Sequence, residues 1–301
     1  MSSSVDSVKV YRTWKDLAVK MCKLCGSKIM EDVNKRNYLE SHSNDLASGS
    51  LKTGVVSIKS TVADLVTETD QEVERMIKEM IKQNYPDHFF VGEETSEETG
   101  GKLSLTNNPT WVVDPIDGTT NFVHKNPGFC VSIGVLHNKR PVVGVVYEVF
   151  GDNLYWAVEG MGAYRNGESL SVTDCDKLEK CLLMTETTSR RDEQSISDVT
   201  KTISNLLAAG LSAMRMTGSA ALNVCKVAEG SADGYYEIGP HIWDVAAAAV
   251  ILTEAGGHLL HPKTLEPAAL EAREFLAVGE KVELAKLISP HVEKSFQLES
   301  D

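Results

Sequence analysis

The sequence lacks any long apolar run. No stretch reaches the roughly 18 consecutive apolar residues that a membrane-spanning helix needs. Residues 1–7 carry neither a positively charged start nor an apolar core, so no secretory signal is visible. We therefore expect a protein without a membrane partner, located in the cytoplasm.

Cysteines are few and lack a spacing typical of a functional site. They are scattered at positions 22, 25, 130, 175, 181 and 225, and Cys22 and Cys25 form the one close pair. A redox motif of this type follows a strand, and a zinc site needs a second pair; the sequence predicts neither. We interpret Cys22 and Cys25 as two residues within one turn of an opening helix, with all thiols reduced.

Positive charge is also in deficit, with 30 Lys and Arg against 43 Asp and Glu and a formal net charge of −13. This balance disfavours binding to nucleic acid or to an anionic membrane surface, because both need a basic patch. It would also repel a phosphorylated substrate. Bound divalent cations remove that difficulty, because they invert the local sign of the charge.

The 301 residues, 42% of them hydrophobic, can bury a sizeable core. Apolar periodicity predicts helices at 11–30 and 70–84, the second capped by Thr69 or Asp70. Residues 42–60 form a polar segment that we interpret as a mobile hairpin or lid. An antiparallel meander is predicted from Phe129 to Arg165, and strands alternate with helices from 181 onward. This alternation indicates α/β layers, and the change around 150–180 predicts two sub-domains that meet at a cleft.

Residues 111–122 read Trp-Val-Val-Asp-Pro-Ile-Asp-Gly-Thr-Thr-Asn-Phe and carry the most information. A β-branched stretch presents Asp114 and Asp117, and Pro115 is expected to end the strand after Asp114. Gly118 permits a tight backbone next to a ligand, and residues 119–121 can cap a following helix. Carboxylates beside an open helix N-terminus suit a metal-bridged phosphate.

The same motif resembles the signature of the inositol monophosphatase family. Two further pieces agree with that family in order and spacing: Gly92-Glu93-Glu94 upstream, and Trp243-Asp244-Val245-Ala246 downstream. The resemblance extends from about Tyr11 to Ile288 and departs locally at Asn126 and Pro240. It implies a five-layered α-β-α-β-α sandwich and a Mg²⁺-dependent phosphoric monoester hydrolase that is inhibited by lithium and forms a homodimer.

By this resemblance we divide the chain into four parts. These are a disordered tail at 1–10, an N-terminal α+β sub-domain at 11–165 with most metal ligands, a C-terminal α/β sub-domain at 166–290 that closes the cleft, and a tail at 291–301.

The resemblance also implies the metal ligands. Glu93, Asp114 and the carbonyl of Ile116 would hold a first ion, and Asp114, Asp117 and Asp244 a second; Glu93 would reach a third through water. Hard oxygen ligands without a His/Cys cluster favour Mg²⁺ over Zn²⁺, so two to three Mg²⁺ ions are expected. From the residues alone, Asp244 is equally well a partner of a helix N-terminus, and Asp70 a helix cap.

For catalysis, the resemblance implies that Thr119, with Asp70 behind it, positions and deprotonates the attacking water, assisted by Glu93. The amides of Gly118 and Thr119 would hold the phosphate. A polar wall would bind the hydroxyls of a small polyol phosphate, an inositol monophosphate. Its residues would be Asp117, Ser189, Gly218, Ser219, Ala220 and Glu237.

Other interpretations stay open at this point. Glu237 is alternatively a surface carboxylate, Lys59 a solvated lysine, and His124 and His241 polar rim residues. The superfamily also contains phosphatases of fructose bisphosphate, inositol polyphosphate and adenosine bisphosphate, which need more basic residues than Arg190 and Arg191 near the cleft. A third alternative is a non-catalytic binding protein.

Overall fold

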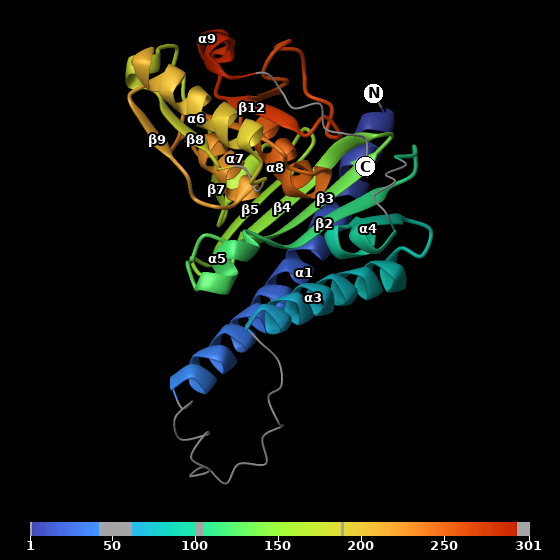
Figure 1. The fold of residues 1–301 in the computed structure, drawn as a ribbon. Coiled ribbons are helices and arrows are strands. Elements are labelled where there is room, and N and C mark those ends of the chain that lie inside the picture. The colour runs from blue at the N-terminus through green and yellow to red at the C-terminus, as the bar shows by residue number, and fades with distance from the viewer. Residues whose placement is uncertain (1, 42–61, 100–104, 188–189, 294–301) are drawn as a thin grey trace.

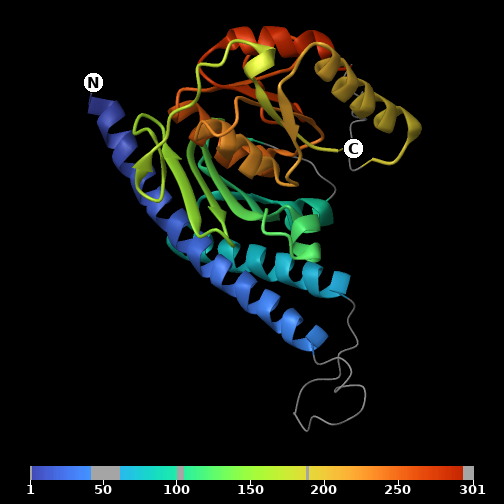
Figure 2. The same ribbon diagram turned by 90° about the vertical axis from the view of Figure 1, so that its left-hand side faces the viewer.

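The structure, a computed structural model, describes residues 2–41, 62–99, 105–187 and 190–293. Two sheets alternate with three layers of helices, as Figures 1 and 2 show. The predicted five-layered α-β-α-β-α sandwich is therefore confirmed. Within the described part of the chain, no helix is long and apolar enough to cross a membrane.

The first sheet has seven strands in chain order. Strands β1 and β2 are parallel, and all later neighbours pair antiparallel. Helices α1 (Ser2–Ser41) and α3 (Val62–Asn84) cover its outer face (Figure 2). The strands are β1 (Phe89–Gly92), β2 (Thr110–Asp117), β3 (Cys130–His137), β4 (Arg140–Glu148), β5 (Asn153–Val158), β6 (Ala163–Arg165) and β7 (Glu168–Ser169).

The second sheet has five strands in the order β11-β12-β10-β8-β9. Helices α6 (Glu193–Ala208) and α9 (Val282–Ile288) cover its outer face, with their apolar side chains in one core cluster with the sheet. The strands are β8 (Leu182–Thr185), β9 (Ala213–Arg215), β10 (Gly234–Ile238), β11 (His258–Leu260) and β12 (Glu274–Val278). Short helical segments are α4 (Glu93–Thr99), α5 (Thr119–His124), η1 (Leu178–Lys180) and η2 (Ser289–His291).

Helices α7 (Ala220–Ala228) and α8 (Ile242–Glu254) form the middle layer and share one apolar core with both sheets. Residues 245–252 of α8 are all buried, which explains why this helix has no polar face. The helix lies so close to the first sheet that a β-carbon at Gly134 would come within 3.0 Å of the Ala246 side chain. The run of alanines in α8 and the glycines of β3 and β4 permit this close packing.

The structure corrects several sequence predictions at the N-terminal side. Helix α1 begins at Ser2, so the prediction of a disordered tail at 1–10 is wrong. The helix is anchored by Tyr11, whose ring is buried and whose hydroxyl lies 2.9 Å from His137 Nδ1. Helix α3 begins at Val62, so Asp70 lies inside it and is no cap. The predicted lid at 42–60, with Lys59, lies outside the described residues.

Two further predictions concern boundaries and thiols. The first sheet continues to Ser169, so the predicted sub-domain boundary at 165/166 falls inside the β6–β7 hairpin.

Cys22 and Cys25 are buried on α1, as interpreted, and all six cysteines are free thiols. Burial raises the pKa of Cys25 to about 12, so the thiol stays protonated and unreactive.

Candidate active site

A β-bulge in β2 brings both carboxylates of the motif to one face of the first sheet. Asp114 pairs with Ser132 and Asp117 with Cys130, so three steps along β2 oppose two along β3. Without the extra residue, Asp114 and Asp117 would point to opposite faces. Pro115 therefore does not end the strand; it lies in the bulge, where its missing N–H disturbs the ladder least.

The bulge is stabilised by the first carboxylate itself. Asp114 Oδ1 accepts a hydrogen bond from the Ile116 N–H at 3.0 Å. Ile116 is fully buried in the core beneath α1 and α3, whereas Val112, two residues before Asp114, packs in the core on the opposite face. The alternation of side chains between the two faces of the sheet therefore shifts by one residue between Asp114 and Asp117. As a result, both carboxylates are buried at the same edge of the sheet.

Asp117 connects the first sheet to the middle helices. Its Oδ2 accepts hydrogen bonds from the Ser219 hydroxyl at 2.5 Å and from the Ala221 N–H at 2.7 Å. Ser219 is the N-cap of α7 and accepts in turn from the Leu222 N–H at 3.1 Å. One oxygen of Asp117 therefore stabilises the start of α7.

Asp244 comes to the same place from the second half of the chain. It lies in the first turn of α8, and its Oδ2 accepts a hydrogen bond from the His241 N–H at 2.6 Å. Carboxylate oxygens of Asp114, Asp117 and Asp244 all lie within 4.8 Å of one another. One oxygen of Asp244 therefore serves the helix start, and the residue also joins the acidic cluster, where its role as a metal ligand stays a prediction.

Glu93 is the first residue of α4, a helix that the sequence analysis did not predict. The buried Glu74 on α3 accepts hydrogen bonds from the N–H groups of Glu94 at 2.8 Å and Thr95 at 2.9 Å. Its carboxylate also lies directly against Gly92, leaving no room for a β-carbon there. Glu74 thus fixes the start of α4 and the position of Glu93.

These acids strongly perturb one another. Burial raises the pKa of Asp114 well above its usual range, and the charges of Glu93 and Asp117 raise it further. Burial and the charge of Asp244 raise the pKa of Glu93 to about 8. The pKa of Asp244 rises to about 7 through burial and the charge of Asp117. For Asp117 burial raises the pKa only to about 6, because hydrogen bonds from α7 favour the charged form.

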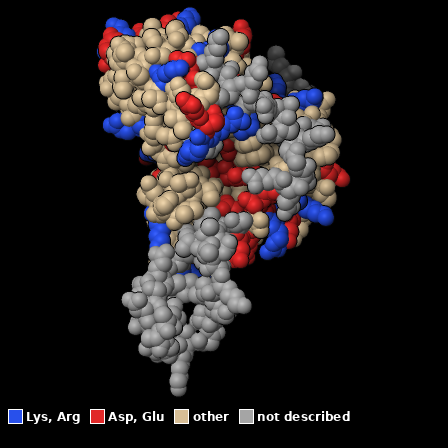
Figure 3. Space-filling view, in the orientation of Figure 1, with Lys and Arg blue, Asp and Glu red and all other residues tan. Residues whose placement is uncertain are grey.

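The cluster lies at the bottom of a cleft of about 890 Å³ between the two halves of the molecule. Figure 3 shows acidic side chains gathered near the middle of one face. Among the predicted site residues, those that line the cleft are Glu93, Asp114, Ile116, Asp117, Gly118, Thr119, Gly218, Ala220, Glu237 and Asp244.

Comparison with known proteins agrees with this geometry. The sequence pattern described as the inositol monophosphatase family matches residues 11–295. The chain belongs to the inositol monophosphatase family. It is 46% identical to inositol monophosphatase 1 of Bos taurus over 238 residues, which are 79% of this chain and 85% of the bovine protein.

Solved structures of the inositol monophosphatase family share the fold. An inositol monophosphatase from Anabaena (Nostoc) has a TM-score of 0.72 and 32% identity, covering 93% of this chain and 95% of its own. Inositol monophosphatase-II from Staphylococcus aureus has a TM-score of 0.76 and 26% identity, covering 95% of this chain and 99% of its own. Membership of this family therefore explains the fold and identifies the protein as a phosphatase.

The donor set fits the metal ions on which this family depends. The clustered groups are three carboxylates from two elements, Asp114 and Asp117 on β2 and Asp244 on α8, and hard divalent cations prefer such oxygen ligands. In the absence of a cation, the raised pKa values of Asp114, Glu93 and Asp244 express their mutual repulsion as well as their burial. Among the described residues no ion pair joins these acids to a Lys or Arg, and the charge of Arg273 offsets only part of the rise in the pKa of Asp244, so a bound divalent cation would compensate the remaining charge.

Thr119 and Asp70 differ in their exposure to solvent. Thr119 is exposed in the cleft, and its hydroxyl donates to the Ile116 carbonyl at 3.1 Å. Helix α5 has Gly118 as N-cap in the left-handed conformation (φ 94°) without a side-chain cap, so the predicted capping by residues 119–121 is wrong. Asp70 is buried on α3, where burial and the charge of Glu93 raise its pKa to about 8.

The predicted polyol wall is only partly as expected. Glu237 lines the cleft, and the Tyr235 hydroxyl donates to its Oε2 at 2.6 Å. Burial raises the pKa of Glu237 well above its usual range. Ser219 is fully buried behind Asp117, so its side chain does not reach the cleft. Ser189 lies outside the described residues.

Several residues of the site were missed because their partners are distant in sequence. Glu74 and Glu186 hold cleft segments that lie 20 and 32 residues away along the chain through hydrogen bonds, and neither stands in a recognisable motif. Asn121 is not a cap of α5, and its Nδ2 instead donates to the carbonyls of Gly128 (2.5 Å) and Thr217 (2.6 Å).

Proposed function

We propose that this protein hydrolyses inositol monophosphates to inositol and inorganic phosphate, with Mg²⁺ as its cofactor. The observation that carries the proposal is that one cleft holds a cluster of three carboxylates, Asp114, Asp117 and Asp244, together with Glu237, which lines the same cleft. The first group suits cations that bind a phosphate, and the second suits the hydroxyls of the alcohol.

Asp114, Asp117 and Asp244 would hold the cations, together with Glu93 and the Ile116 carbonyl at the edge of the same cleft. The family resemblance supports two to three ions. When bound, Mg²⁺ supplies Lewis acidity toward water and phosphate oxygens at neutral pH.

The chain itself contributes positioning and proton transfer. The Thr119 hydroxyl lies at the cleft surface beside the Ile116 carbonyl, where it can orient an attacking water. Asp70, with its pKa of about 8, is suited to exchange a proton with that hydroxyl near neutral pH. The first amides of α5, at Gly118 and Thr119, have no partners within their helix and are available to the phosphate oxygens.

Recognition of the alcohol would rest on Glu237. A carboxylate held by Tyr235 at 2.6 Å keeps its second oxygen for substrate hydroxyls. A polyol with vicinal hydroxyls satisfies that oxygen, whereas an apolar alcohol would leave a buried carboxylate unpaired. We also propose lithium inhibition, a homodimer and a cytoplasmic location, each supported by family resemblance.

The test is release of phosphate from inositol 1-phosphate with and without Mg²⁺. We expect Mg²⁺-dependent turnover, and weaker turnover of fructose 1,6-bisphosphate and adenosine 3′,5′-bisphosphate. Preference for either bisphosphate would replace the proposed substrate class. Absence of turnover on all three would support the non-catalytic alternative.

A further inference from the structure

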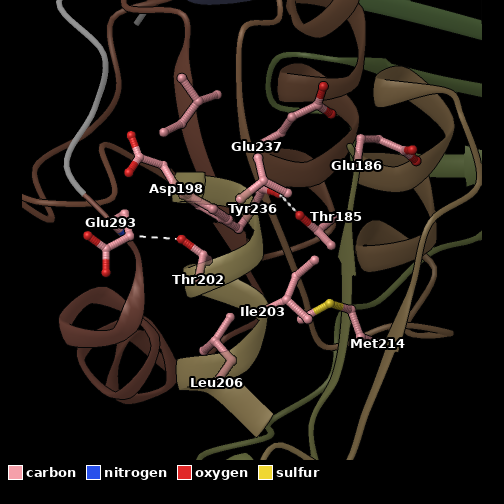
Figure 4. Close-up of a pocket in the computed structure, with 12 residues that line it drawn as sticks. Thr185, Glu186, Asp198, Thr202, Ile203, Leu206, Met214, Tyr236, Glu237 and Glu293 are labelled. Carbon is pink, nitrogen blue, oxygen red and sulfur yellow. Dashed lines mark hydrogen bonds between the residues drawn. The ribbon is translucent and has the colours of Figure 1, made fainter. Parts of the chain in front are cut away.

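Two glutamates stand side by side where neighbouring strands of the second sheet end. Strands β8 and β10 are parallel, and Thr185 pairs with Tyr236. The next residues, Glu186 and Glu237, therefore lie at the same edge, and both line the cleft. In Figure 4 both carboxylates lie on the side away from Glu293.

The Glu186 carboxylate is bound by one segment of the cleft wall. Its Oε1 accepts hydrogen bonds from the N–H groups of Thr217 (2.7 Å) and Gly218 (2.6 Å) and from Asn223 Nδ2 (2.8 Å). Asn223 is fully buried on α7 and accepts from the Thr217 hydroxyl at 2.5 Å. Hydrogen bonds to an ionised acceptor are stronger than neutral ones, so this carboxylate holds the segment firmly.

The opposite side of the segment is held by the first half of the chain. Asn121 Nδ2 donates to the Thr217 carbonyl at 2.6 Å. Gly218 has a φ of 87°, and a β-carbon there would lie 2.6 Å from the Asn121 side chain. Residues 217 and 218 are thus clamped between Glu186 and Asn121, directly before Ser219 and Ala220.

We propose that Glu186 is a positioning residue for the polyol wall of the cleft. By engaging the amides of Thr217 and Gly218, it turns them away from the substrate and fixes Gly218 and Ala220 opposite the acidic cluster. The space between this segment and Glu237 then has one defined width. The inference deepens the proposed function and rests on it, because the ligand shaped by this wall is the alcohol part of the phosphate ester.

The first measurement uses hydrogen exchange of the ligand-free protein at the amides of 217 and 218. Wild type is compared with Glu186→Ala, Glu186→Gln and the control Glu179→Ala, which changes an exposed glutamate before β8. We expect exchange to rise about tenfold or more in Glu186→Ala, as for loss of a hydrogen bond to a charged group, and less in Glu186→Gln. Unchanged exchange in Glu186→Ala would overturn the proposal.

The second measurement separates positioning from general loss of structure. In Glu186→Ala we expect KM for inositol 1-phosphate to rise about tenfold, with kcat much less affected and KM for glycerol 2-phosphate nearly unchanged. Equal losses on both substrates, or the same losses in Glu179→Ala, would overturn it. If wild type does not hydrolyse inositol 1-phosphate, the proposed function fails, and hydrogen exchange still decides whether Glu186 holds the segment.

Discussion

On one wall of the cleft, carboxylate oxygens of Asp114, Asp117 and Asp244 lie within 4.8 Å of one another. On the other wall, Glu186 receives three N–H donors and Glu237 one hydroxyl. On the first wall the carboxylates lie close to one another as well as to protein donors, whereas on the second wall Glu186 alone is held by three N–H groups. Both walls carry carboxylates, so the amount of negative charge alone does not distinguish them.

The difference indicates which wall depends on a cation. Backbone hydrogen bonds on the acidic wall satisfy single oxygens, such as those from Ile116 to Asp114 and from His241 to Asp244. The remaining charge needs a partner from outside the chain. Each carboxylate of the second wall, which we propose binds the polyol, has at least one hydrogen-bond donor from the protein, so we expect this wall to form without a cation. The two walls should respond differently to substitution.

The largest effect is expected at Asp114. Asp114→Asn should lower kcat by more than about 10³-fold, because a buried ligand of the cations is lost, while the protein stays folded. Thermal unfolding should show an unchanged or raised midpoint, since removing one charge relieves repulsion from Glu93 and Asp117. Asp174→Asn, at an exposed position, is the control. Activity within tenfold of wild type would disprove the assignment.

Next in size is the pair Thr119 and Asp70. Thr119→Ala and Asp70→Asn should each lower kcat by about 10²–10⁴-fold with little change in the Mg²⁺ requirement. In the described structure the Thr119 hydroxyl donates to the Ile116 carbonyl and no hydrogen bond joins it to Asp70, so we propose that a water couples the two side chains during turnover. The double variant should be little worse than either single one. Additive losses in log kcat at saturating Mg²⁺ would show that they act independently.

On the polyol wall a smaller and selective effect is expected. Glu237→Gln should reduce kcat/KM for inositol 1-phosphate about 10–100-fold, but that for glycerol 2-phosphate much less. Tyr235→Phe removes the hydroxyl that holds Glu237 and should show the same preference more weakly. Equal losses on both esters would mean that Glu237 serves the chemistry or the fold.

The smallest effect concerns stability and pH. A carboxyl whose pKa is raised by folding holds its proton longer in the folded state. For Glu93, with a pKa of about 8, the folded state therefore loses stability as pH rises from its unfolded pKa of about 4 to about 8. Mg²⁺ competes with these protons, so it should raise the unfolding midpoint more at about pH 8 than at about pH 6.

In calorimetry, this Mg²⁺ effect should shrink in Asp114→Asn and persist in Glu186→Gln. The same Mg²⁺ effect at both pH values in wild type would contradict the origin assigned to the raised pKa values. A loss of the effect in Glu186→Gln would show that the two walls are not independent.

The layer order and the grouping of Asp114, Asp117 and Asp244 followed from the sequence only through its resemblance to the family. The residues themselves determined the acidic motif and the burial of α8. Local chemistry sufficed there: a β-branched strand with two acids, and an alanine-rich apolar helix that can only be buried. Helix lengths were less predictable, since α1 extends from Ser2 to Ser41, well beyond its local apolar pattern at 11–30.

Only the tertiary structure decided to which face of the first sheet the two carboxylates of the motif point. The bulge at Pro115 depends on pairing with β3, and it reverses the alternation that a plain strand would give Asp117. Glu74, Asn121 and Glu186 act through hydrogen-bond partners that lie up to 96 residues away along the chain, the separation of Asn121 from the Thr217 carbonyl that it binds. A buried carboxylate or amide reveals its partner only when the chain has folded, because the same side chain in an isolated sequence is equally well a solvated surface group.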